Sequence, residues 1–534
     1  MKKRVKKHIQ NVILPCVIFA GITGMITGGI VFAFRVISER IIEWSKEIYA
    51  FANANPAYIP LLAIGALLAA LIVSFALTYS PHSRGGGIPT AVALMRGLIT
   101  FHWLRNIIFV FTSALLSYIC GIPLGNDEGP AVQMGTAVGS GTTKLFAKKH
   151  RAWERYLMTG GATAGFATAT GAPVAAVLFG LEEAHSRFSP LLIMSSISSV
   201  MCGMGVLEVL CRIFDKHSAL FHFTIGEILP LRLIWVAIPV GLLCGLFAFL
   251  FAKTTLKIRT VLHKRLKNVH TFFKVAPVFL LVTLVGCFSY QCIGTGHALI
   301  EELLEQRVVW YVALALLLVR SLLVILSNDV GATGGLFTPL LVCGALIGSM
   351  LAEGMIAMGL LEPRYFMLLV VIGMASFFAA SVRTPLTAMV FSVEVLSGFG
   401  NVLPILLAVI ISYVIVEVVG VTSINEIAME REIHRENRGR SKSIVDVDVV
   451  AMPGSFAVGK EPRDILWPAS CYVLSVRKDE NARDYYAGGV IKENDILRLN
   501  FTTYDMERTA SELCAIMGEQ DIHDDAEILS AEGR

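Results

Sequence analysis

The sequence contains little charge. Only 16% of its 534 residues are Asp, Glu, Lys or Arg, whereas 55% are hydrophobic and the mean hydropathy is +0.67. Because a soluble domain carries roughly a quarter charged residues, this composition excludes an ordinary soluble protein over most of the chain and predicts a membrane-embedded one. The formal net charge is only +4, and we expect no nucleic-acid partner.

Metal-binding and catalytic motifs are missing as well. The ten cysteines are scattered, several of them in apolar runs, without CxxC or any other ligand spacing. We therefore expect reduced, packed thiols, no metal site and no cofactor. A membrane enzyme would need a nucleophile–base pair or a set such as HExxH, and His297 in GTGHAL stands in no such pattern. The sequence predicts a protein that is not an enzyme.

Uncharged stretches long enough to span about 30 Å of hydrocarbon recur along the chain. They are Val12–Phe34, Pro60–Thr78, Tyr156–Leu181, Ser189–Leu207, Leu233–Ala252, Val275–Ile300, Val330–Ala352 and Val395–Val416. Others, such as Ile107–Pro123 and Val308–Val319, are short for a spanning helix and indicate tilted, broken or partial helices. We expect an all-α polytopic membrane protein over this part of the chain.

The charges before the first apolar stretch indicate its orientation. Five basic residues lie there (Lys2, Lys3, Arg4, Lys6 and Lys7), which predicts a cytosolic N-terminus. A signal peptide is the alternative, but the stretch is too long for a typical h-region and lacks an Ala-x-Ala-like end.

The composition changes near residue 443. Apolar stretches continue to about Gly420, and MEREIHRENRGRSKS then indicates a helix leaving the bilayer or a linker. From Ile444 onward CYVLSVRKD and DILRLNF predict strands, and DMERTASELCAIMGEQ predicts a helix, so a small α+β cytosolic C-terminal domain is expected. The expected organisation is a basic N-terminus at 1–11, a transmembrane domain at 12–430, a linker at 431–443, the C-terminal domain at 444–520 and an acidic tail at 521–534.

The membrane part repeats itself. GATAGFATATGAPVAAVLFGLE (161–182) matches GMASFFAASVRTPLTAMVFSVE (373–394), including Pro173 with Pro385 and Glu182 with Glu394. The stretch from Gly125 likewise matches the one from Gly334. These matches predict two duplicated halves, at about 12–215 and 230–430. Paired halves with interrupted apolar segments indicate a transporter-like fold whose binding site lies at the repeat interface.

Three clusters of glycine and proline interrupt the apolar stretches. They are GGGIP (85–89), GNDEGP (125–130) and GGLFTP (334–339). Proline is favoured in the first turn of a helix, and glycine allows a sharp turn and a close approach of the backbone. Each cluster therefore predicts a helix that begins inside the membrane, where free N–H groups and the positive end of the dipole can bind an anion. The alternative is that the clusters are kinks or close-packing sites, which are common in membrane helices.

The ordered set of clusters resembles the signature segments GSGIP, GREGP and GxFxP of the CLC family of chloride channels and proton-coupled chloride transporters. The resemblance covers about residues 12 to 430, including GLEEA and RTPLTAMVFSVE. It implies a CLC-type inverted repeat of broken and tilted helices, a homodimer, and one pathway per subunit for chloride or a related anion and for protons. It also implies a multi-pass protein of the cell membrane, plasma or inner, with both termini in the cytosol.

The resemblance assigns an anion-binding set. Its members are Gly86, Gly87, Ile88, Pro89, Gly129, Pro130, Leu336, Phe337 and Asn425. Two of these residues depart from the family: Gly86 stands where a serine hydroxyl normally touches the anion, and Asn425 stands where a tyrosine is expected. Chloride is the expected substrate, and a selectivity shifted towards nitrate or fluoride remains an alternative.

Two acids carry the expected proton chemistry, because an ionisable residue inside a membrane is costly and marks a functional site. Glu128 matches the gating glutamate of GREGP, and its carboxylate would compete with the anion until it is protonated. A helix-capping carboxylate is the alternative. Asp127 stands where the family usually has arginine, and Asn126 lengthens the segment, so weaker attraction of external anions is expected.

The pair Glu182 and Glu183 separates into two roles. Glu182 has a repeat partner in Glu394, which favours a structural role. Glu183 has Val395 opposite it, and the resemblance makes it the internal proton acceptor of an exchanger. A solvated acid at a helix end near His185 is the alternative.

The C-terminal stretch VLSVRKDENARDYYAGGVIKENDILRLNF resembles the TrkA C-terminal-type domain of potassium systems, with a turn from Gly489 to Asp495. That resemblance implies dimerisation and a small cytosolic ligand, although a module with an empty pocket is also possible. Proton-coupled anion exchange is the leading hypothesis. A passive chloride channel is the alternative, against which Glu183 counts. A cation transporter subunit is disfavoured, because the broken segments offer positive helix starts.

Overall fold

The computed structural model describes residues 13–148, 150–216, 227–305, 307–395, 399–478, 489–522 and 527–529. The basic N-terminus at 1–11, most of the acidic tail and part of the loop before Gly489 lie outside these residues. The first eight helices are α2 (Leu14–Ala54), α3 (Ile59–Tyr79), α4 (Ile88–Met95), α5 (Trp103–Ile119), α6 (Glu128–Phe146), α7 (Glu154–Thr170), α8 (Pro173–Phe179) and α9 (Pro190–Phe214). A π-helical turn, Gly180–His185, continues α8.

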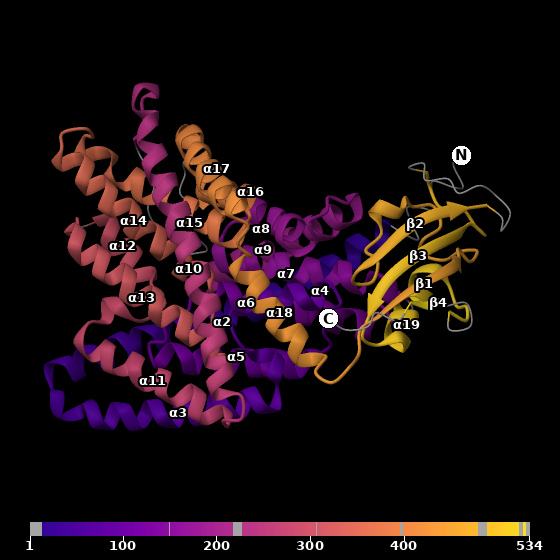
Figure 1. Ribbon diagram of the computed structural model, residues 1–534, viewed down its shortest axis with the longest axis horizontal. Coiled ribbons are helices and arrows are strands. Elements are labelled where there is room, and N and C mark those ends of the chain that lie inside the picture. The colour runs from indigo at the N-terminus through magenta and orange to yellow at the C-terminus, as the bar shows by residue number, and fades with distance from the viewer. Residues whose placement is uncertain are drawn as a thin grey trace.

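The second group of helices ends at the C-terminal domain (Figure 1). Its members are α10 (Ala237–Leu266), α11 (Thr271–Phe288), α12 (His297–Glu305), α13 (Trp310–Val330), α14 (Phe337–Ala357), α15 (Phe366–Val382), α16 (Pro385–Val395), α17 (Val402–Val419) and α18 (Ile424–Glu436). Short 3₁₀ turns lie at Pro56–Tyr58, Pro81–Ser83, Arg151–Trp153, Leu231–Val236, Tyr290–Cys292, Pro363–Tyr365, Phe399–Asn401 and Pro462–Asp464.

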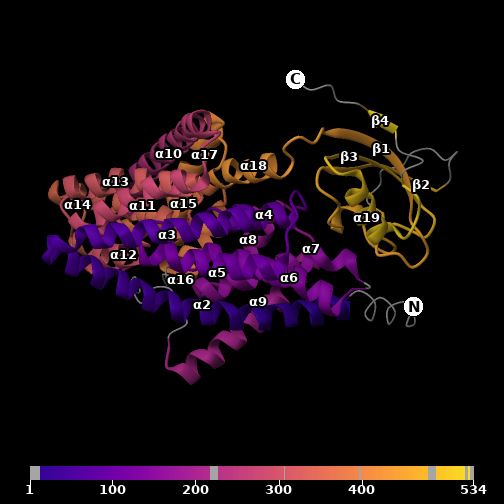
Figure 2. The same ribbon diagram turned by 90° about the horizontal axis from the view of Figure 1, so that it is seen from below.

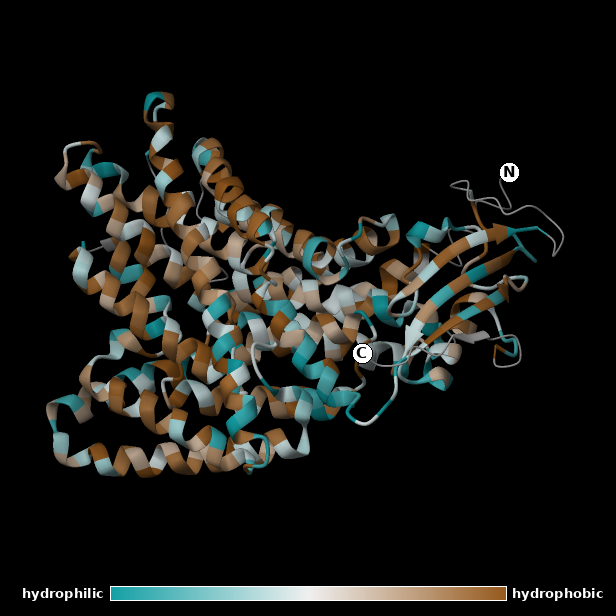
Figure 3. Ribbon diagram, in the orientation of Figure 1, coloured by the Kyte–Doolittle hydropathy of each residue, from teal (hydrophilic) through white to brown (hydrophobic). Residues whose placement is uncertain are grey.

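Nine helices among the described residues are long and apolar enough to cross a membrane. Their outward faces carry large exposed apolar side chains, such as Phe75 on α3 at 64% and Val418 on α17 at 79%. Figure 3 shows α3 and α17 as hydrophobic along most of their length. Lipid tails are the solvent that suits such faces, so this part of the chain has the character of a multi-pass membrane protein.

The expectation of a short helix at Val308–Val319 is wrong. Helix α13 continues through Arg320, which is 1% exposed. The Arg320 guanidinium donates to the carbonyl oxygens of Gln291 at 2.8 Å, Ile293 at 2.7 Å and Gly294 at 2.8 Å. Because these carbonyls satisfy the buried charge, the arginine does not end the helix. The other short stretch is a 17-residue helix, α5, as expected.

In each of the two matched halves, a pair of helices packs through reciprocal contacts of glycines. A methyl group at Gly135 of α6 would overlap the carbonyl oxygen of Gly161 of α7, and the converse also holds. Gly344 of α14 and Gly373 of α15 have the same relation. Both helix pairs therefore pack backbone to backbone, which only glycine allows, and the glycines that allow it are ones that match between the halves.

Glu182 and Glu394 cap each other's helices. Glu182 accepts from the N–H groups of Leu386 at 3.0 Å and Thr387 at 2.8 Å, at the start of α16. Glu394 accepts from Val174 and Ala175 at the start of α8, both at 2.9 Å. A carboxylate at a helix N-terminus pairs free N–H groups and meets the positive end of the dipole. These contacts support the structural role expected of Glu182.

The C-terminal domain is an antiparallel sheet with one helix. Strands β1 (Ser443–Val450), β2 (Cys471–Arg477), β3 (Ile496–Thr503) and β4 (Glu527–Leu529) lie in the order β2-β3-β1-β4. Helix α19 (Met506–Met517) packs its apolar face against buried residues of the sheet such as Val447 and Leu499. The strands and helix expected from CYVLSVRKD, DILRLNF and DMERTASELCAIMGEQ are confirmed.

The segment from residue 431, expected as a linker or a helix leaving the bilayer, begins as a helix. Helix α18 starts at Ile424, with Ser423 as its N-cap, and runs to Glu436. It stays ordered because Arg431 donates to the carbonyl oxygens of Asn328 at 3.2 Å and Asp329 at 3.0 Å. Helix α18 leads from the helical body to the sheet at one end of the molecule (Figure 2).

Candidate functional site

The three glycine–proline clusters meet in the structure. Gly335 donates its N–H to the carbonyl oxygen of Gly125 at 3.2 Å, and Gly125 donates in return. A methyl group at Gly129 would overlap the Gly86 carbonyl oxygen and lie 2.6 Å from the Cα atom of Gly335. Gly87 has a φ of +74°, and a methyl group there would overlap the carbonyl oxygen of Gly129. The starts of α4, α6 and α14 therefore converge, at a spacing that side chains would prevent.

Glu128 is the first residue of α6 and is fully buried at this junction. The Thr338 hydroxyl of α14 donates to its Oε1 at 2.6 Å. Its Oε2 has no hydrogen-bond partner among the described residues and faces Gly335. A buried carboxylate oxygen normally has a partner. One oxygen of the Glu128 carboxylate therefore bonds to the start of a second helix, α14, and the other has no hydrogen-bond partner among the described residues.

Asp127 points elsewhere. It is 2% exposed and accepts a hydrogen bond from the Ser38 hydroxyl of α2 at 2.7 Å. The preceding Asn126 offers its carbonyl oxygen to the Tyr118 hydroxyl at 2.5 Å. Asp127 and Asn126 are therefore bonded to α2 and α5, respectively.

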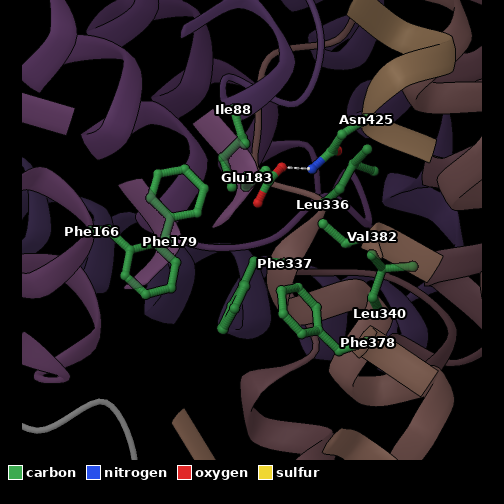
Figure 4. A pocket seen from close by; sticks show the side chains of 10 residues that line it. All are labelled: Ile88, Phe166, Phe179, Glu183, Leu336, Phe337, Leu340, Phe378, Val382 and Asn425. Atoms are coloured by element: carbon green, nitrogen blue, oxygen red, sulfur yellow. Dashed lines mark hydrogen bonds between the residues drawn. The ribbon is translucent and has the colours of Figure 1, made fainter. Parts of the chain in front are cut away.

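Glu183 lies in a small cavity on another side of the α14 start (Figure 4). The lining residues are Ile88, Phe166, Phe179, Glu183, Leu336, Phe337, Leu340, Phe378, Val382 and Asn425. The Asn425 side-chain amide donates to Glu183 Oε1. Ile88, Leu336, Phe337 and Asn425, all predicted as anion-binding, are thus gathered around Glu183, while Glu128 does not line this cavity.

Aromatic rings form the cavity wall. The Phe337 ring meets Phe166 at 5.2 Å, Phe378 at 4.7 Å and Phe391 at 4.8 Å between centroids, each edge to face. Phe166 stacks on Phe179 at 5.1 Å. The four partner rings of this group were not named as site residues from the sequence; they are Phe166, Phe179, Phe378 and Phe391. The signal was present, because Phe166 matches Phe378 and Phe179 matches Phe391 in the repeat.

Leu336 packs closely against Gly86. A methyl group at Gly86 would lie 3.1 Å from Cγ and 3.2 Å from Cδ1 of Leu336. A side chain at position 86 would therefore require the leucine to shift slightly. The nearest neighbour of position 86 is thus an apolar side chain.

The turn that carries Glu183 is held by basic and polar side chains. Arg96 donates to the carbonyl oxygens of Glu183 at 2.9 Å and Ala184 at 2.7 Å. His185 Nε2 lies 2.7 Å from the Thr159 hydroxyl. Glu183 therefore faces a lined cavity from a fixed turn, which does not fit the alternative of a solvated acid at a helix end.

No three His, Cys, Asp or Glu side chains within the described ranges are placed to hold a metal ion. The ten cysteines are all unpaired, and seven of them are buried. The site consists of converging helix starts, two acids and an aromatic cavity.

Converging helix starts around a buried acid, in a body of membrane-crossing helices, define a class of ion-transport protein. The model of the voltage gated chloride channel family matches residues 65–417, and the chain belongs to this family. The family consists of channels and transporters, not enzymes.

Relatives and solved structures agree with the family. The H(+)/Cl(-) exchange transporter ClcA of Vibrio campbellii is 27% identical over 418 residues, which covers 77% of this chain and 87% of ClcA. The structure of a slow cyanobacterial Cl⁻/H⁺ antiporter aligns with a TM-score of 0.73 at 24% identity, over 79% of this chain and 99% of that one. A CLC-type fluoride/proton antiporter aligns at 0.62 and 20% identity, over 76% and 96%. The helical part therefore has the CLC fold.

Proposed function

We propose that this protein exchanges chloride for protons across a membrane, with Glu128 as the gate. One observation carries the proposal: the Glu128 carboxylate lies buried where three helix starts converge, with one oxygen unpartnered. Helix N-termini attract anions, so a carboxylate there takes the place of a bound anion. The name of the ClcA relative, an H(+)/Cl(-) exchange transporter, supports the same function.

Backbone groups bind the anion in this proposal. The anion-binding set around the junction and cavity comprises Gly86, Gly87, Ile88, Pro89, Gly129, Pro130, Leu336, Phe337 and Asn425. Pro89 and Pro130 lie in the first turns of α4 and α6, where a missing N–H costs no helical hydrogen bond, and the glycines let the backbones approach. The first N–H groups of each helix have no partner within the helix, so they coordinate the anion without a lysine or arginine.

Protonation of Glu128 opens the pathway. The charged carboxylate holds to the helix starts and to the Thr338 hydroxyl. Once neutral, it loses its attraction to the positive ends of the helices and yields its position to chloride. Each protonation and deprotonation of Glu128 thus exchanges its carboxylate for chloride at the helix starts, which couples proton movement to chloride movement.

Glu183 is the internal proton acceptor in this scheme. It takes protons from the cytosolic side and passes them, through water that enters the cavity, towards Glu128. The Asn425 amide holds one oxygen of Glu183, and Phe337 lines the same cavity as Glu183. The retained acid at position 183 favours an exchanger over a passive channel.

Chloride is the proposed substrate, and a fluoride- or nitrate-selective exchanger is the second candidate. The observation behind the second candidate is that Gly86 offers no hydroxyl and has the apolar Leu336 as its nearest neighbour. An exchanger that relies on backbone N–H groups alone has fewer contacts by which to discriminate anions.

We infer the remaining organisation from the family resemblance and the repeat. The two halves are inverted in the membrane, two chains form a homodimer, and both termini face the cytosol at the cell membrane. The C-terminal domain is TrkA C-terminal-like and regulatory, with a small cytosolic ligand. Its Lys492–Asp495 turn is ordered, because Asp495 accepts from the Lys492 N–H at 2.8 Å.

Reconstitution in liposomes tests the proposal. An imposed chloride gradient should drive protons uphill in the unmutated protein. Glu183→Gln should stop proton flux while chloride still moves, and Glu128→Gln should remove both coupling and pH dependence. Chloride flux without any proton movement in the unmutated protein would favour the channel, and fluoride flux far above chloride flux would favour the second candidate.

A further inference from the structure

The C-terminal domain docks on the first turn of α7, which carries Trp153 just before it. The Tyr156 hydroxyl donates to the carbonyl oxygen of Asp464 at 2.9 Å and accepts from the Leu466 N–H at 3.0 Å. The Trp153 ring meets Phe456 edge to face at 5.1 Å. Leu466, 7% exposed, joins an apolar cluster that is otherwise made mainly of membrane-part residues. The contact combines buried apolar surface with satisfied backbone groups, so it is a built interface.

Glu512 of α19 joins two arginines across this interface. Arg155 of α7 donates to Glu512 and to the carbonyl oxygen of Trp467. Arg508 contacts the other oxygen of Glu512 at 3.2 Å and donates to the carbonyl oxygen of Ile99 at 3.1 Å. The Glu512 carboxylate thus bonds both to Arg155 on α7 and to Arg508, which reaches the loop after α4.

That loop leads directly to the turn of Glu183. The Arg155 guanidinium lies so close to Gly97 that a methyl group there would overlap it. The neighbouring Arg96 donates to the carbonyl oxygens of Glu183 and Ala184. Arg155 therefore packs directly against the loop through which Arg96 holds the Glu183 backbone.

A second connection runs along α7. Thr159 lies one turn after Arg155, donates to the Arg155 carbonyl oxygen at 2.8 Å, and contacts His185 at 2.7 Å. Leu181, in the same π-helical turn, packs in the apolar cluster that includes Leu466 of the C-terminal domain. A π-helical turn is a rare conformation that is frequent at functional sites, and this one is contacted by α7 through His185 and by the C-terminal domain through the cluster of Leu181.

We propose that Arg96 and Arg155 are positioning residues for Glu183, and that Glu512 of the C-terminal domain sets them. Docking of the domain then controls how well Glu183 exchanges protons with the cavity. Release of Glu512 frees Arg155 and loosens the loop at Gly97, and the Glu183 turn moves away from Asn425. The part of this inference that concerns protons rests on the proposed role of Glu183.

Flux in liposomes tests the effect on coupling, with the full-length protein and the variants Glu512→Gln and Arg155→Gln. Each should lower the ratio of proton to chloride flux by about fivefold, the low end of coupling between sites. The double variant should be no worse than either single one, because both remove the same link. The control is Asp448→Asn, which breaks the 3.4 Å ion pair with Arg477 on the sheet and should leave the ratio unchanged.

Hydrogen exchange tests the positioning independently of transport. In Glu512→Gln, the amides of residues 180–187 should exchange faster than in the unmutated protein, while the amides of residues 128–140 should exchange at the same rate. In Asp448→Asn, neither range should change. Unchanged exchange at 180–187 would overturn the inference whatever the fluxes show. If the unmutated protein moves no protons, the exchanger proposal fails, and the exchange experiment still decides whether the domain positions the turn. Equal flux ratios in all variants of a working exchanger would also overturn it.

Discussion

Individual side chains at the junction determine what an anion would meet there. Among the residues that the structure describes, the hydroxyl bonded to Glu128 belongs to Thr338 of α14, and the other carboxylate oxygen has no hydrogen-bond partner. Leu336 packs closely against Gly86. An anion bound as proposed would meet an apolar leucine and no serine hydroxyl at this point.

Restoring the hydroxyl should restore discrimination between anions. Gly86→Ser alone should impair transport and destabilise the protein by about 1–3 kcal/mol, because its Cβ atom would lie 3.1 Å from Leu336 Cγ and the leucine would have to shift in a packed environment. Gly86→Ser combined with Leu336→Ala should recover flux and raise the preference for chloride over nitrate and fluoride. The measurement is relative anion flux in liposomes, with Leu336→Ala as control. Unaltered selectivity in the double variant would contradict the account.

Lys460 makes a second prediction at the residue scale, in the C-terminal domain. The residue is 6% exposed, and its ammonium lies 3.6 Å from the centre of the Phe456 ring and donates to the Phe456 carbonyl oxygen. Burial lowers the pKa of Lys460 to about 8. The unfolded lysine keeps its proton to about pH 10, so the free energy of unfolding should rise with pH between these values.

Lys460→Met keeps the side-chain stem and removes the charge. It should stabilise the C-terminal domain at pH 7 by about 3 kcal/mol at most, since the pKa of Lys460 falls from 10.5 to about 8 and each pKa unit corresponds to about 1.4 kcal/mol. The gain should shrink at pH 9.5, where the folded lysine is neutral. Scanning calorimetry of the full-length protein at both pH values measures it. A gain that does not change with pH would show that packing, not charge, is responsible.

At the scale of elements, two short helices stabilise each other through exchanged carboxylates. Glu182 caps α16 and Glu394 caps α8. The π-helical turn after α8 carries Glu183 one residue beyond the capping acid. The same turn thus presents one acid to the protein backbone and the next to the cavity.

The two capping acids should behave alike and unlike Glu183. Glu182→Gln and Glu394→Gln should each lower the free energy of unfolding by about 1–3 kcal/mol, because charge-assisted bonds to helix N–H groups are weakened. The proton to chloride ratio should stay close to that of the unmutated protein. Thermal unfolding in detergent and flux in liposomes measure both effects. A loss of coupling in Glu394→Gln would show that the acids are not equivalent.

At the scale of the whole molecule, the sequence predicted the parts that depend on local patterns. Helix starts at the glycine–proline clusters and the repeat follow from spacing and backbone preference, and so does the α+β character of the C-terminal domain. Contacts between distant segments left no such pattern. The bonds of Asp127 to Ser38 and of Asn425 to Glu183 join residues far apart in the chain, as does the docking of Glu512 on Arg155.

Arg320 shows the same limit of local sequence patterns, here for a buried charge. A charge in an apolar stretch usually ends it, and the stretch at Val308–Val319 was therefore expected to be short. Three carbonyl oxygens from the segment before α12 satisfy the arginine, and the helix continues. The partner of a buried charge decides its effect, and a partner in a distant loop cannot be read from the local sequence.

The competition between Glu128 and chloride is the central claim, and the affinity for chloride measured by titration calorimetry at several pH values tests it most directly. The unmutated protein should bind chloride more tightly as pH falls, because a protonated Glu128 gives up the helix starts. Glu128→Gln should bind chloride tightly at every pH, with Glu182→Gln as a control that keeps the normal pH dependence. Equal pH dependence in the unmutated protein and in Glu128→Gln, or weaker binding in that variant, would contradict the account.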